Sequence, residues 1–403
     1  MSGMSGKTIQ THGSARLCIT PVDSEQVFIT AALAGPADTR QGAADVYQAV
    51  AQFLSEHGML AVHERIFGSL AAYDAIVGAR GERLARNGVD PATPVTYLQG
   101  NPLRGQGLAG VNMMAIRPAK PQDVWMVRDD AGLPLGRGWR RRGATFLLLQ
   151  NLNGKDPRTG EDRSIQAGRM FDRADGLLRT QNTDYRSVAR TWLYISGILS
   201  WYGEFNKVRS AKYGHFGLMP ALGPVGEPGG SNGKAILLPA STGIEGSTPA
   251  GAAVTMDFLS ARLSPGGGIE IHQMTNRKQK DAFKYGSAFS RGAAIRMPRA
   301  TWISLSGTAA IDEAGVTMHV GDFKAQMNAT LNAIEALIAQ EGAGLGDLCD
   351  ITCFVKLPEH VETYHEILAQ RGLKDLVAVP VLADICRDDL LFEMDGAAVV
   401  RRS

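Results

Sequence analysis

The stretch from residue 301 to residue 340 decides the fold, because it places a strand directly before a long helix. Residues 301–310 read TWISLSGTAA, in which strand-forming residues end in small ones, as in a strand that leads into a turn. Residues 322–340 read DFKAQMNATLNAIEALIAQ, in which apolar residues recur at steps of three and four. This spacing predicts an amphipathic helix, and Gly342 and Gly344 end it.

The sequence that follows continues the same unit. A strand over 350–356 (DITCFVK) precedes a helix over 358–371, and two further strands are expected over 377–383 and 389–400. The order is strand, helix, strand, helix, strand, strand. Such an order predicts an α+β unit.

The same order of elements occurs twice more. The middle copy has strands expected over 144–153, 188–195, 236–244 and 252–261 and helices over 164–182 and 202–213. A fainter first copy has strands over 26–34, 62–69, 95–99 and 108–117 and helices over 42–56 and 73–86. Repetition of this kind predicts three units of one architecture, with domains at 1–120, 121–268 and 269–403.

The segments between these elements are rich in Gly, Pro and charge. Residues 118–139 and 264–284 are interpreted as linkers, and residues 223–233 as a mobile surface loop inserted in the second unit. The first linker ends in a basic cluster, Arg137, Arg140, Arg141 and Arg142. An anionic partner is one interpretation of that cluster, and a solvated face is the favoured one.

Composition bounds the class of protein. Of 403 residues, 44% are hydrophobic and 20% charged, which excludes wholesale disorder. A formal net charge of +2 argues against nucleic acid or a membrane surface as partner. No apolar run is long enough to span a membrane, the first residues lack the apolar stretch of a secretory signal, and the four cysteines form no CxxC pair. A cytoplasmic protein is expected.

Several motifs carry a family resemblance. They are FSRG at 289–292, SGTAAID at 306–312, the segment PVLADICRDDLLFEMDGAAV from Pro380 and, in the second copy, LPASTGIEG at 238–246. Together they resemble the Rid (YjgF-like) superfamily, small α+β domains that assemble as trimers with ligand clefts between subunits. The resemblance implies three tandem Rid/YjgF-like (chorismate-mutase-like) units that form a covalent pseudo-trimer.

Within that superfamily the third copy is similar to the chorismatases. The similarity implies a cofactor-independent lyase or hydrolase that removes the enolpyruvyl group from chorismate, or from a related unsaturated cyclic carboxylate. The products would be a hydroxybenzoate-type compound and pyruvate. It also implies that Glu393 donates or accepts a proton, and that Cys386 marks the branch associated with 3-hydroxybenzoate formation.

Two alternatives stay open. One is a Rid-like imine or enamine hydrolase, or a tautomerase, acting on a small biosynthetic intermediate. Deaminases of the superfamily carry an arginine fifteen residues before the glutamate, where this chain has Ala378, and this difference disfavours deamination. The other is a non-catalytic ligand-binding Rid-like protein, which the retained Glu393 disfavours.

The sequence around Glu393 and Cys386 supports a catalytic role for the first more than for the second. Glu393 lies in the apolar strand segment LLFEMDG, where burial is expected to raise the pKa of its carboxyl group, as a general acid requires. Copies one and two are aligned with Asn112 and Asp257 at that place, which predicts one competent cleft. Cys386 is by default a small buried hydrophobe, and on a regular strand Arg387 would point to the opposite face.

The remaining candidates concern the substrate. A small carboxylate-bearing substrate needs cationic donors, for which Arg291, Arg190 and then Arg209 are the candidates. Further substrate-binding candidates are Ser306, Gly307, Tyr194 and Phe289. His360 and His365 do not share a helix face, so neither a metal site nor a cofactor is expected. The protein is expected to be a monomer or a homodimer.

Overall fold

The structure is a computed structural model. It describes residues 6–402 except residues 34, 36, 37, 142, 157, 220–237, 277, 278 and 280–286. Its helices and strands fall into three successive units.

The first unit comprises β1–β7 with α1 and α2. Its elements are β1 (Thr8–His12), β2 (Ala15–Pro21), β3 (Gln26–Leu33), α1 (Thr39–Glu56), β4 (Leu60–Gly68), α2 (Tyr73–Arg86), β5 (Thr96–Gln99), β6 (Asn101–Pro102) and β7 (Leu108–Ile116).

The second unit comprises β8–β13 with α3 and α4, and the third comprises β14–β19 with α5 and α6. The second has β8 (Val124–Arg128), β9 (Pro134–Arg141), β10 (Ala144–Asn153), α3 (Arg163–Thr180), β11 (Val188–Ile195), α4 (Tyr202–His215), β12 (Ala240–Glu245) and β13 (Val254–Leu263). The third has β14 (Glu270–Met274), β15 (Gly292–Met297), β16 (Ala300–Ala309), α5 (Phe323–Ile338), β17 (Leu348–Val355), α6 (Val361–Gln370), β18 (Val379–Leu382) and β19 (Phe392–Arg401).

All three units build their sheets in one strand order. The first sheet runs β1-β2-β3-β7-β4-β5, the second β8-β9-β10-β13-β11-β12 and the third β14-β15-β16-β19-β17-β18. The short β6 of the first unit pairs with β18 at the edge of the third sheet. The first helix of each unit begins at an aspartate, Asp38, Asp162 or Asp322, whose side chain accepts a backbone N–H of the first turn.

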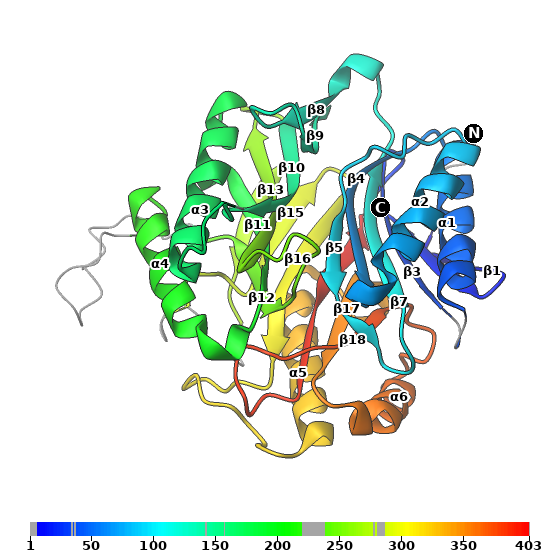
Figure 1. Ribbon diagram of the computed structural model, residues 1–403, viewed down its shortest axis with the longest axis vertical. Coiled ribbons are helices and arrows are strands. Elements are labelled where there is room, and N and C mark those ends of the chain that lie inside the picture. The colour runs from blue at the N-terminus through cyan, green and yellow to red at the C-terminus, as the bar shows by residue number, and fades with distance from the viewer. Residues whose placement is uncertain are drawn as a thin grey trace.

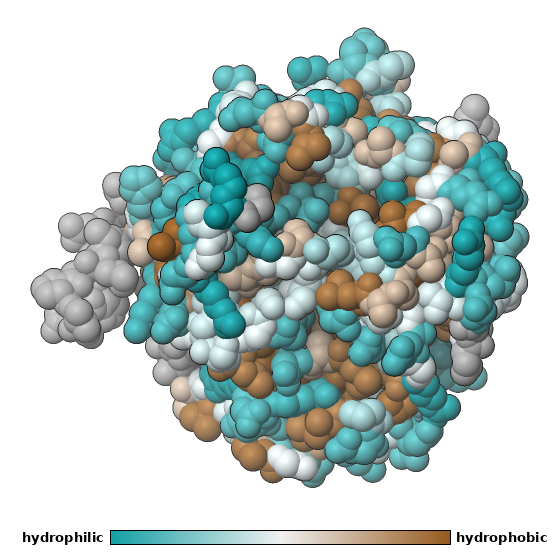
Figure 2. Space-filling view, viewed as in Figure 1, coloured by the Kyte–Doolittle hydropathy of each residue, from teal (hydrophilic) through white to brown (hydrophobic). Residues whose placement is uncertain are grey.

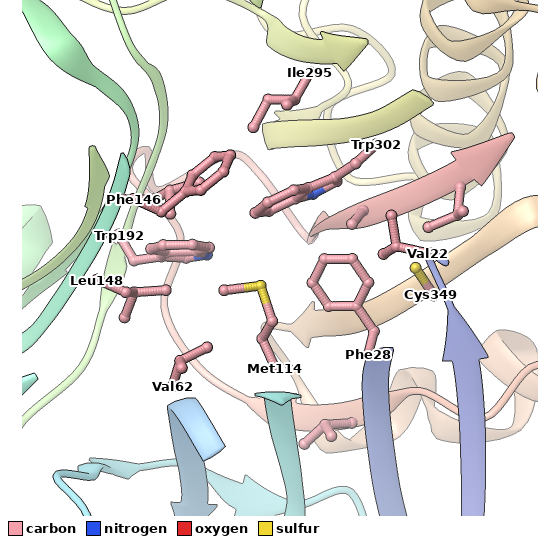
Figure 3. Close-up of a cluster of buried hydrophobic side chains, with 14 of the residues drawn as sticks. Val22, Phe28, Val62, Met114, Phe146, Leu148, Trp192, Ile295, Trp302 and Cys349 are labelled. Atoms are coloured by element: carbon pink, nitrogen blue, oxygen red, sulfur yellow. The ribbon is translucent and has the colours of Figure 1, made fainter. Parts of the chain in front are cut away.

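Each sheet packs its own helices on one face and the other two sheets on the other. Three separate apolar clusters join each sheet to its helices, and a fourth draws residues from all three sheets. Figure 1 shows the sheets at the centre and the helix pairs on the outside. Figure 3 shows the central cluster, where Phe28 and Met114 of the first unit meet Trp192 of the second and Trp302 of the third. Each sheet therefore buries both of its faces.

The same threonine–aspartate hydrogen bond occurs at two of the three boundaries between units. Thr96 Oγ1 of β5 donates to Asp257 of β13 at 2.7 Å, and Thr242 Oγ1 of β12 donates to Asp395 of β19 at 2.7 Å. At the third boundary the strand register places Val379 of β18 where the other units have threonine. The three boundaries are therefore alike in geometry and different in chemistry.

The expected fold is confirmed, and one part of the expectation is wrong. The α+β class, the three Rid-like units and their pseudo-trimeric arrangement all appear, and the helices and strands expected in each copy are found. The supposed linkers, however, contain strands: β8 and most of β9 lie in 118–139, and β14 lies in 264–284. The limits at residues 120 and 268 stay a prediction. The expected loop at 223–233 and residues 236–237 of an expected strand lie outside the described residues.

Glycines explain why the hairpin of β8 and β9 resembles a linker in sequence. A Cβ at Gly136 would overlap the backbone at Leu148, and one at Gly138 would overlap the Trp125 ring. Close strand packing therefore requires glycine where a strand pattern would have a larger residue.

The basic cluster is engaged with the protein itself. Arg137 donates to Thr93 at 3.0 Å, Arg140 lies over the Trp125 ring, and Arg141 pairs with an aspartate of the first unit. Arg142 lies outside the described residues. Figure 2 shows hydrophilic residues over much of the visible face, with apolar residues in scattered groups. Among the described residues, no helix has the length and apolarity to cross a membrane.

Candidate functional site

A small cavity lies where the second and third units meet. Its volume is about 40 Å³, and its wall contains Glu393. The second unit supplies part of the wall from α4 and β12, and the third supplies the rest from β16, β19 and the segments that adjoin β15, β16 and β19. The lining residues are Tyr202, Ser241, Gly243, Ser287, Phe289, Arg291, Gly307, Ala309, Ile311, Cys386, Arg387 and Glu393.

Glu393 is the acidic residue of this wall. It lies on β19 opposite Ala309 of β16, and only 4% of its surface is exposed. Burial, and after it the negative charge of Asp395, raise the pKa of its carboxyl group to about 8 against the lowering effect of Arg291 and Arg190. At neutral pH Glu393 therefore holds a proton that it can donate.

Two guanidinium groups flank the ring of Phe289. Arg291 is 2% exposed and lies 5.6 Å from the ring centroid, and Arg209 of α4 lies 5.5 Å from it. Arg209 also donates to Asn206 at 2.6 Å. Of these two arginines, Arg291 lines the cavity and Arg209 lies behind Phe289. Arg291 is thus the guanidinium placed to meet a carboxylate beside Glu393.

Cys386 and Arg387 lie in the segment between β18 and β19. Neither is in a strand, so the expectation of a strand cysteine with Arg387 on the opposite face is wrong. Both residues line the cavity. Burial raises the pKa of the Cys386 thiol to about 12, with nearby Glu393 acting in the same direction. The thiol is therefore protonated at neutral pH and is a weak nucleophile.

Ser306 and Gly307 occupy a bulge in β16. The Ser306 hydroxyl donates to the carbonyl of Ser290 at 2.6 Å and accepts the backbone N–H of Ser241 at 2.8 Å. Ser306 therefore ties the third unit to the second, whereas Gly307 forms part of the cavity wall itself.

Arg190 and Tyr194 lie outside this wall. Arg190 is fully buried on β11, where it donates to Thr242 at 2.6 Å and pairs with Asp395 at 3.0 Å. Tyr194 is 1% exposed and belongs to the central apolar cluster. Neither is placed to touch a ligand in the cavity, because alternate residues of β11 face the centre of the molecule. Arg190 acts on Glu393 through its charge and through Asp395.

The register corrects the alignment of the three copies. Asp395 of β19 pairs with Thr352 of β17, and the same place in the other two sheets is taken by Asp257 of β13 and Asn112 of β7. Asn112 and Asp257 therefore correspond to Asp395, and the expectation that they correspond to Glu393 is wrong.

The residues that correspond to Glu393 lie two places earlier. They are Gly110 and Thr255, so neither of the first two units has a carboxylate there. Glu393 and Asp395 stand two residues apart on one strand and thus on one face. When the three copies are aligned by their acidic side chains, Asp257 can therefore be matched to Glu393 in place of Asp395.

Sequence reasoning did not assign Tyr202, Ser241, Ser287 or Arg387 to the site. Two of them, Tyr202 and Ser241, come from the neighbouring unit. Ser241 is the third residue of the PAST segment, the place of the deaminase arginine in that copy, and this position was the one signal that could have found it. Among the described residues, no three His, Cys, Asp or Glu side chains gather as a metal site.

Known proteins resemble the chain over different lengths. The sequence pattern of the endoribonuclease L-PSP family matches residues 280–400. A chorismatase of Streptomyces hygroscopicus is 28% identical over 306 residues, which cover 68% of this chain and 78% of that protein. A 3-hydroxybenzoate synthase of the same organism is 30% identical over 182 residues, covering 40% of this chain and 51% of that protein.

A solved structure supports the fold over most of the chain. The crystal structure of a chorismatase superposes with a TM-score of 0.60 and 22% identity, covering 84% of this chain and 93% of that one. The three sheets share one strand order, and the chain is similar to the endoribonuclease L-PSP family over residues 280–400 and to a chorismatase over 68% of its length, with a chorismatase-like fold of three Rid-like (YjgF-like) units.

Proposed function

We propose that the protein is a chorismatase-like enzyme that removes the enolpyruvyl group from chorismate, or from a related unsaturated cyclic carboxylate. The products are pyruvate and a hydroxybenzoate-type compound. The observation that carries this proposal is Glu393: a buried carboxyl with a pKa of about 8, in a cavity between two units and beside Arg291. Its relatives named chorismatase and 3-hydroxybenzoate synthase support the same reaction class.

The chemistry begins with a proton. The Glu393 carboxyl protonates the methylene carbon of the enol ether, and the electron pair of the C=C bond forms the new C–H bond. The ether carbon becomes an oxocarbenium-like centre. In one route water adds there, the resulting hemiketal collapses to pyruvate and a ring diol, and the diol then loses water to become the aromatic hydroxybenzoate. In the other, rearrangement and aromatisation within the substrate release pyruvate without net uptake of water, and in both routes a proton returns to Glu393.

Arg291 and the cavity walls position the substrate. A guanidinium binds a carboxylate through two parallel hydrogen bonds, and Arg291 is close enough to lower the pKa of Glu393. The cavity of about 40 Å³ is smaller than a typical ligand pocket of ~300–1,000 Å³. A neighbouring cavity of about 380 Å³ shares the walls at Ala309 and Ile311. In this proposal the substrate enters through the larger cavity, and its reacting enol ether reaches Glu393.

The alternative imine or enamine hydrolase has less support. The residue that faces the Glu393 cavity from the deaminase arginine position is Ser241, which cannot hold a carboxylate by charge. A non-catalytic binding protein has no use for a proton-bearing buried glutamate, whose retention costs desolvation. We propose that the enzyme works in the cytoplasm, as a monomer or homodimer, with Glu393 and Cys386 in the reacting cleft.

The test is pyruvate release from chorismate, followed with lactate dehydrogenase. The wild-type protein is expected to release pyruvate, and Glu393→Gln to lose ~10²–10⁴-fold in kcat while keeping its fold. Glu335→Gln on the exposed face of α5 is the matched control and should turn over normally. Wild-type-like turnover in Glu393→Gln would reject the proton shuttle. No pyruvate from the wild-type protein would reject the chorismatase proposal and leave the Rid-like hydrolase.

A further inference from the structure

A second cavity lies where the third unit meets the first. Its volume is about 500 Å³. It is built from the same places of the fold as the Glu393 cavity: Ala378 of the third unit stands where the second unit has Ser241. Ala32 of β3 stands where the third unit has Ala309. The two cavities are thus counterparts under the pseudo-symmetry of the molecule.

This second cavity cannot hold a proton donor where the first one has Glu393. That place belongs to Gly110 of β7. A Cβ there would lie 2.7 Å from the carbonyl oxygen of Ala31 and 2.8 Å from Cγ2 of Val379. No larger residue fits, and none of the residues that line this cavity in the described part of the chain is Asp or Glu.

The wall instead carries positive charge. Arg16 of β2 is half-buried opposite Ala32, and within the described residues no carboxylate lies at ion-pair distance from it. Lys374 is exposed at the rim and also has no ion-pair partner among those residues. Arg104 pairs with Glu362, so its charge is already matched.

Gln106, Tyr364 and His365 also line the cavity, and apolar side chains form most of the remaining wall. Leu33, Leu108, Leu368, Leu376 and Val377 all line the cavity. Pockets of ~300–1,000 Å³ with apolar walls and a few convergent polar groups are typical of small-molecule sites. The ligand that fits such a wall has an apolar body of ring size and a negative charge.

We propose that the cleft between the third and first units binds a small organic anion, a carboxylate on a ring-sized apolar body, and does not transform it. Arg16 binds the carboxylate, Lys374 adds long-range attraction at the entrance, and the leucines cover the ring. The site is independent of the proposed function, because binding is measured without turnover. With no acid at Gly110, the bound anion keeps its bonds.

The experiment is calorimetric titration with 3-hydroxybenzoate as the probe and inorganic phosphate as the comparison ion. Arg291→Ala protein is used beside the wild type, because it weakens binding in the Glu393 cavity. We expect the Arg291→Ala protein to keep one site for the probe and to bind phosphate much more weakly. Arg16→Ala is expected to weaken that site by about tenfold or more, the usual effect of losing a charged hydrogen-bond donor.

Two further variants keep the test decisive. Lys374→Glu changes an exposed residue, so it should fold even if Arg16→Ala does not, and it should weaken the probe severalfold through charge repulsion. Lys207→Ala, an exposed lysine of α4 outside the cavity, is the matched control and should bind like its parent. Unchanged binding in both Arg16→Ala and Lys374→Glu would overturn the proposal. So would the absence of probe binding in Arg291→Ala protein, or phosphate binding as tight as that of the probe.

Discussion

The carboxyl group of Glu393 occupies the space that a side chain at Gly307 would fill. A Cβ built on Gly307 overlaps Oε1 of Glu393 and lies 3.3 Å from Cγ2 of Thr242. Glycine is required here for space, and the bulge of β16 presents its backbone to the carboxyl group. The acid therefore lies directly against the main chain of its own unit, at a place that a threonine of the neighbouring unit also approaches.

The first prediction is that Gly307→Ala abolishes most activity without unfolding the protein. The new methyl group must displace the Glu393 carboxyl, and misplacing a reacting group by about 1 Å can cost ~10²-fold in rate. Overpacking should also lower the free energy of unfolding by ~1–3 kcal/mol. Steady-state kinetics and thermal melting measure the two effects.

Gly168→Ala in α3 is the matched control for this steric test. The nearest atom to a Cβ at Gly168 is Cε of Lys212, at 3.6 Å, which is an ordinary contact. Turnover should therefore stay at the wild-type level, and the melting temperature should stay the same or rise slightly, because alanine favours a helix over glycine. A similar loss of turnover in Gly307→Ala and Gly168→Ala would contradict the steric argument.

The second prediction concerns pH. In the proposed mechanism the acid form of Glu393 is the active one, and the pKa of its carboxyl group is raised to about 8. We therefore expect kcat/KM to be level below that pH and to fall as the pH rises through about 8. Asp395→Asn removes a negative charge that raises this pKa, so the falling limb should move to lower pH.

Thr242→Val is the matched variant for this pH test. It removes the hydroxyl that donates to Asp395 at 2.7 Å but keeps the charges of Asp395 and Arg190. It should lower the free energy of unfolding by ~1–3 kcal/mol, the usual cost of leaving a buried acceptor without its donor. It should shift the pH at which kcat/KM falls by less than Asp395→Asn does. If kcat/KM falls at the same pH in wild-type and Asp395→Asn protein, Asp395 does not influence the proton of Glu393.

The third prediction is that Cys386 shapes the product and not the rate. Its thiol stays protonated at neutral pH, because burial raises its pKa to about 12. Cys386→Ala should therefore keep pyruvate release within severalfold of the wild type and change the proportion of ring products, which chromatography measures. A loss of ~10³-fold or more would instead assign the sulfur a role in the chemical step.

The fourth prediction separates binding from chemistry at Arg291. Because a carboxylate contact is present in both the ground state and the transition state, Arg291→Ala should raise KM by about tenfold or more and change kcat less. Arg291→Lys keeps the charge without the two parallel donors, so it should restore only part of the affinity. Steady-state kinetics of both variants give the two constants. If kcat falls and KM does not change, Arg291 acts in the transition state alone.

Much of the fold could be predicted from the sequence, because helices and central strands have strong periodic patterns. The helix α5 and the strands β10 and β11 follow directly from apolar spacing. The hairpin of β8 and β9 could not be predicted in this way, since Gly136 and Gly138 are required by packing against neighbouring strands and a tryptophan ring.

The candidate site was predicted mainly where its residues belong to the third unit. Glu393 and Arg291 stand in recognisable segments of the third copy, whereas Ser241 and Tyr202 reach the cavity from the second. A pattern within the third copy does not show which residues another copy contributes, so Ser241 could be found only from its own PAST segment.

The placement of Arg190 and Tyr194 depends on which way alternate residues of β11 face. The pairing of β11 with β13 has a bulge between Val188 and Arg190, and this bulge changes which residues of β11 face the centre of the molecule. Sequence alone does not show a bulge.

Because the three units belong to one chain, their boundaries can differ, and these differences favour one order of the units around the pseudo-threefold axis. Two boundaries pair a threonine with an aspartate, whereas Val379 stands at the boundary where the first unit has Asn112. If the third unit were docked on the wrong neighbour, valine would face an aspartate and leave a buried carboxylate without its hydroxyl donor, at a cost of ~1–3 kcal/mol or more. The boundaries therefore disfavour misassembled or domain-swapped forms, a distinction that three identical subunits cannot make.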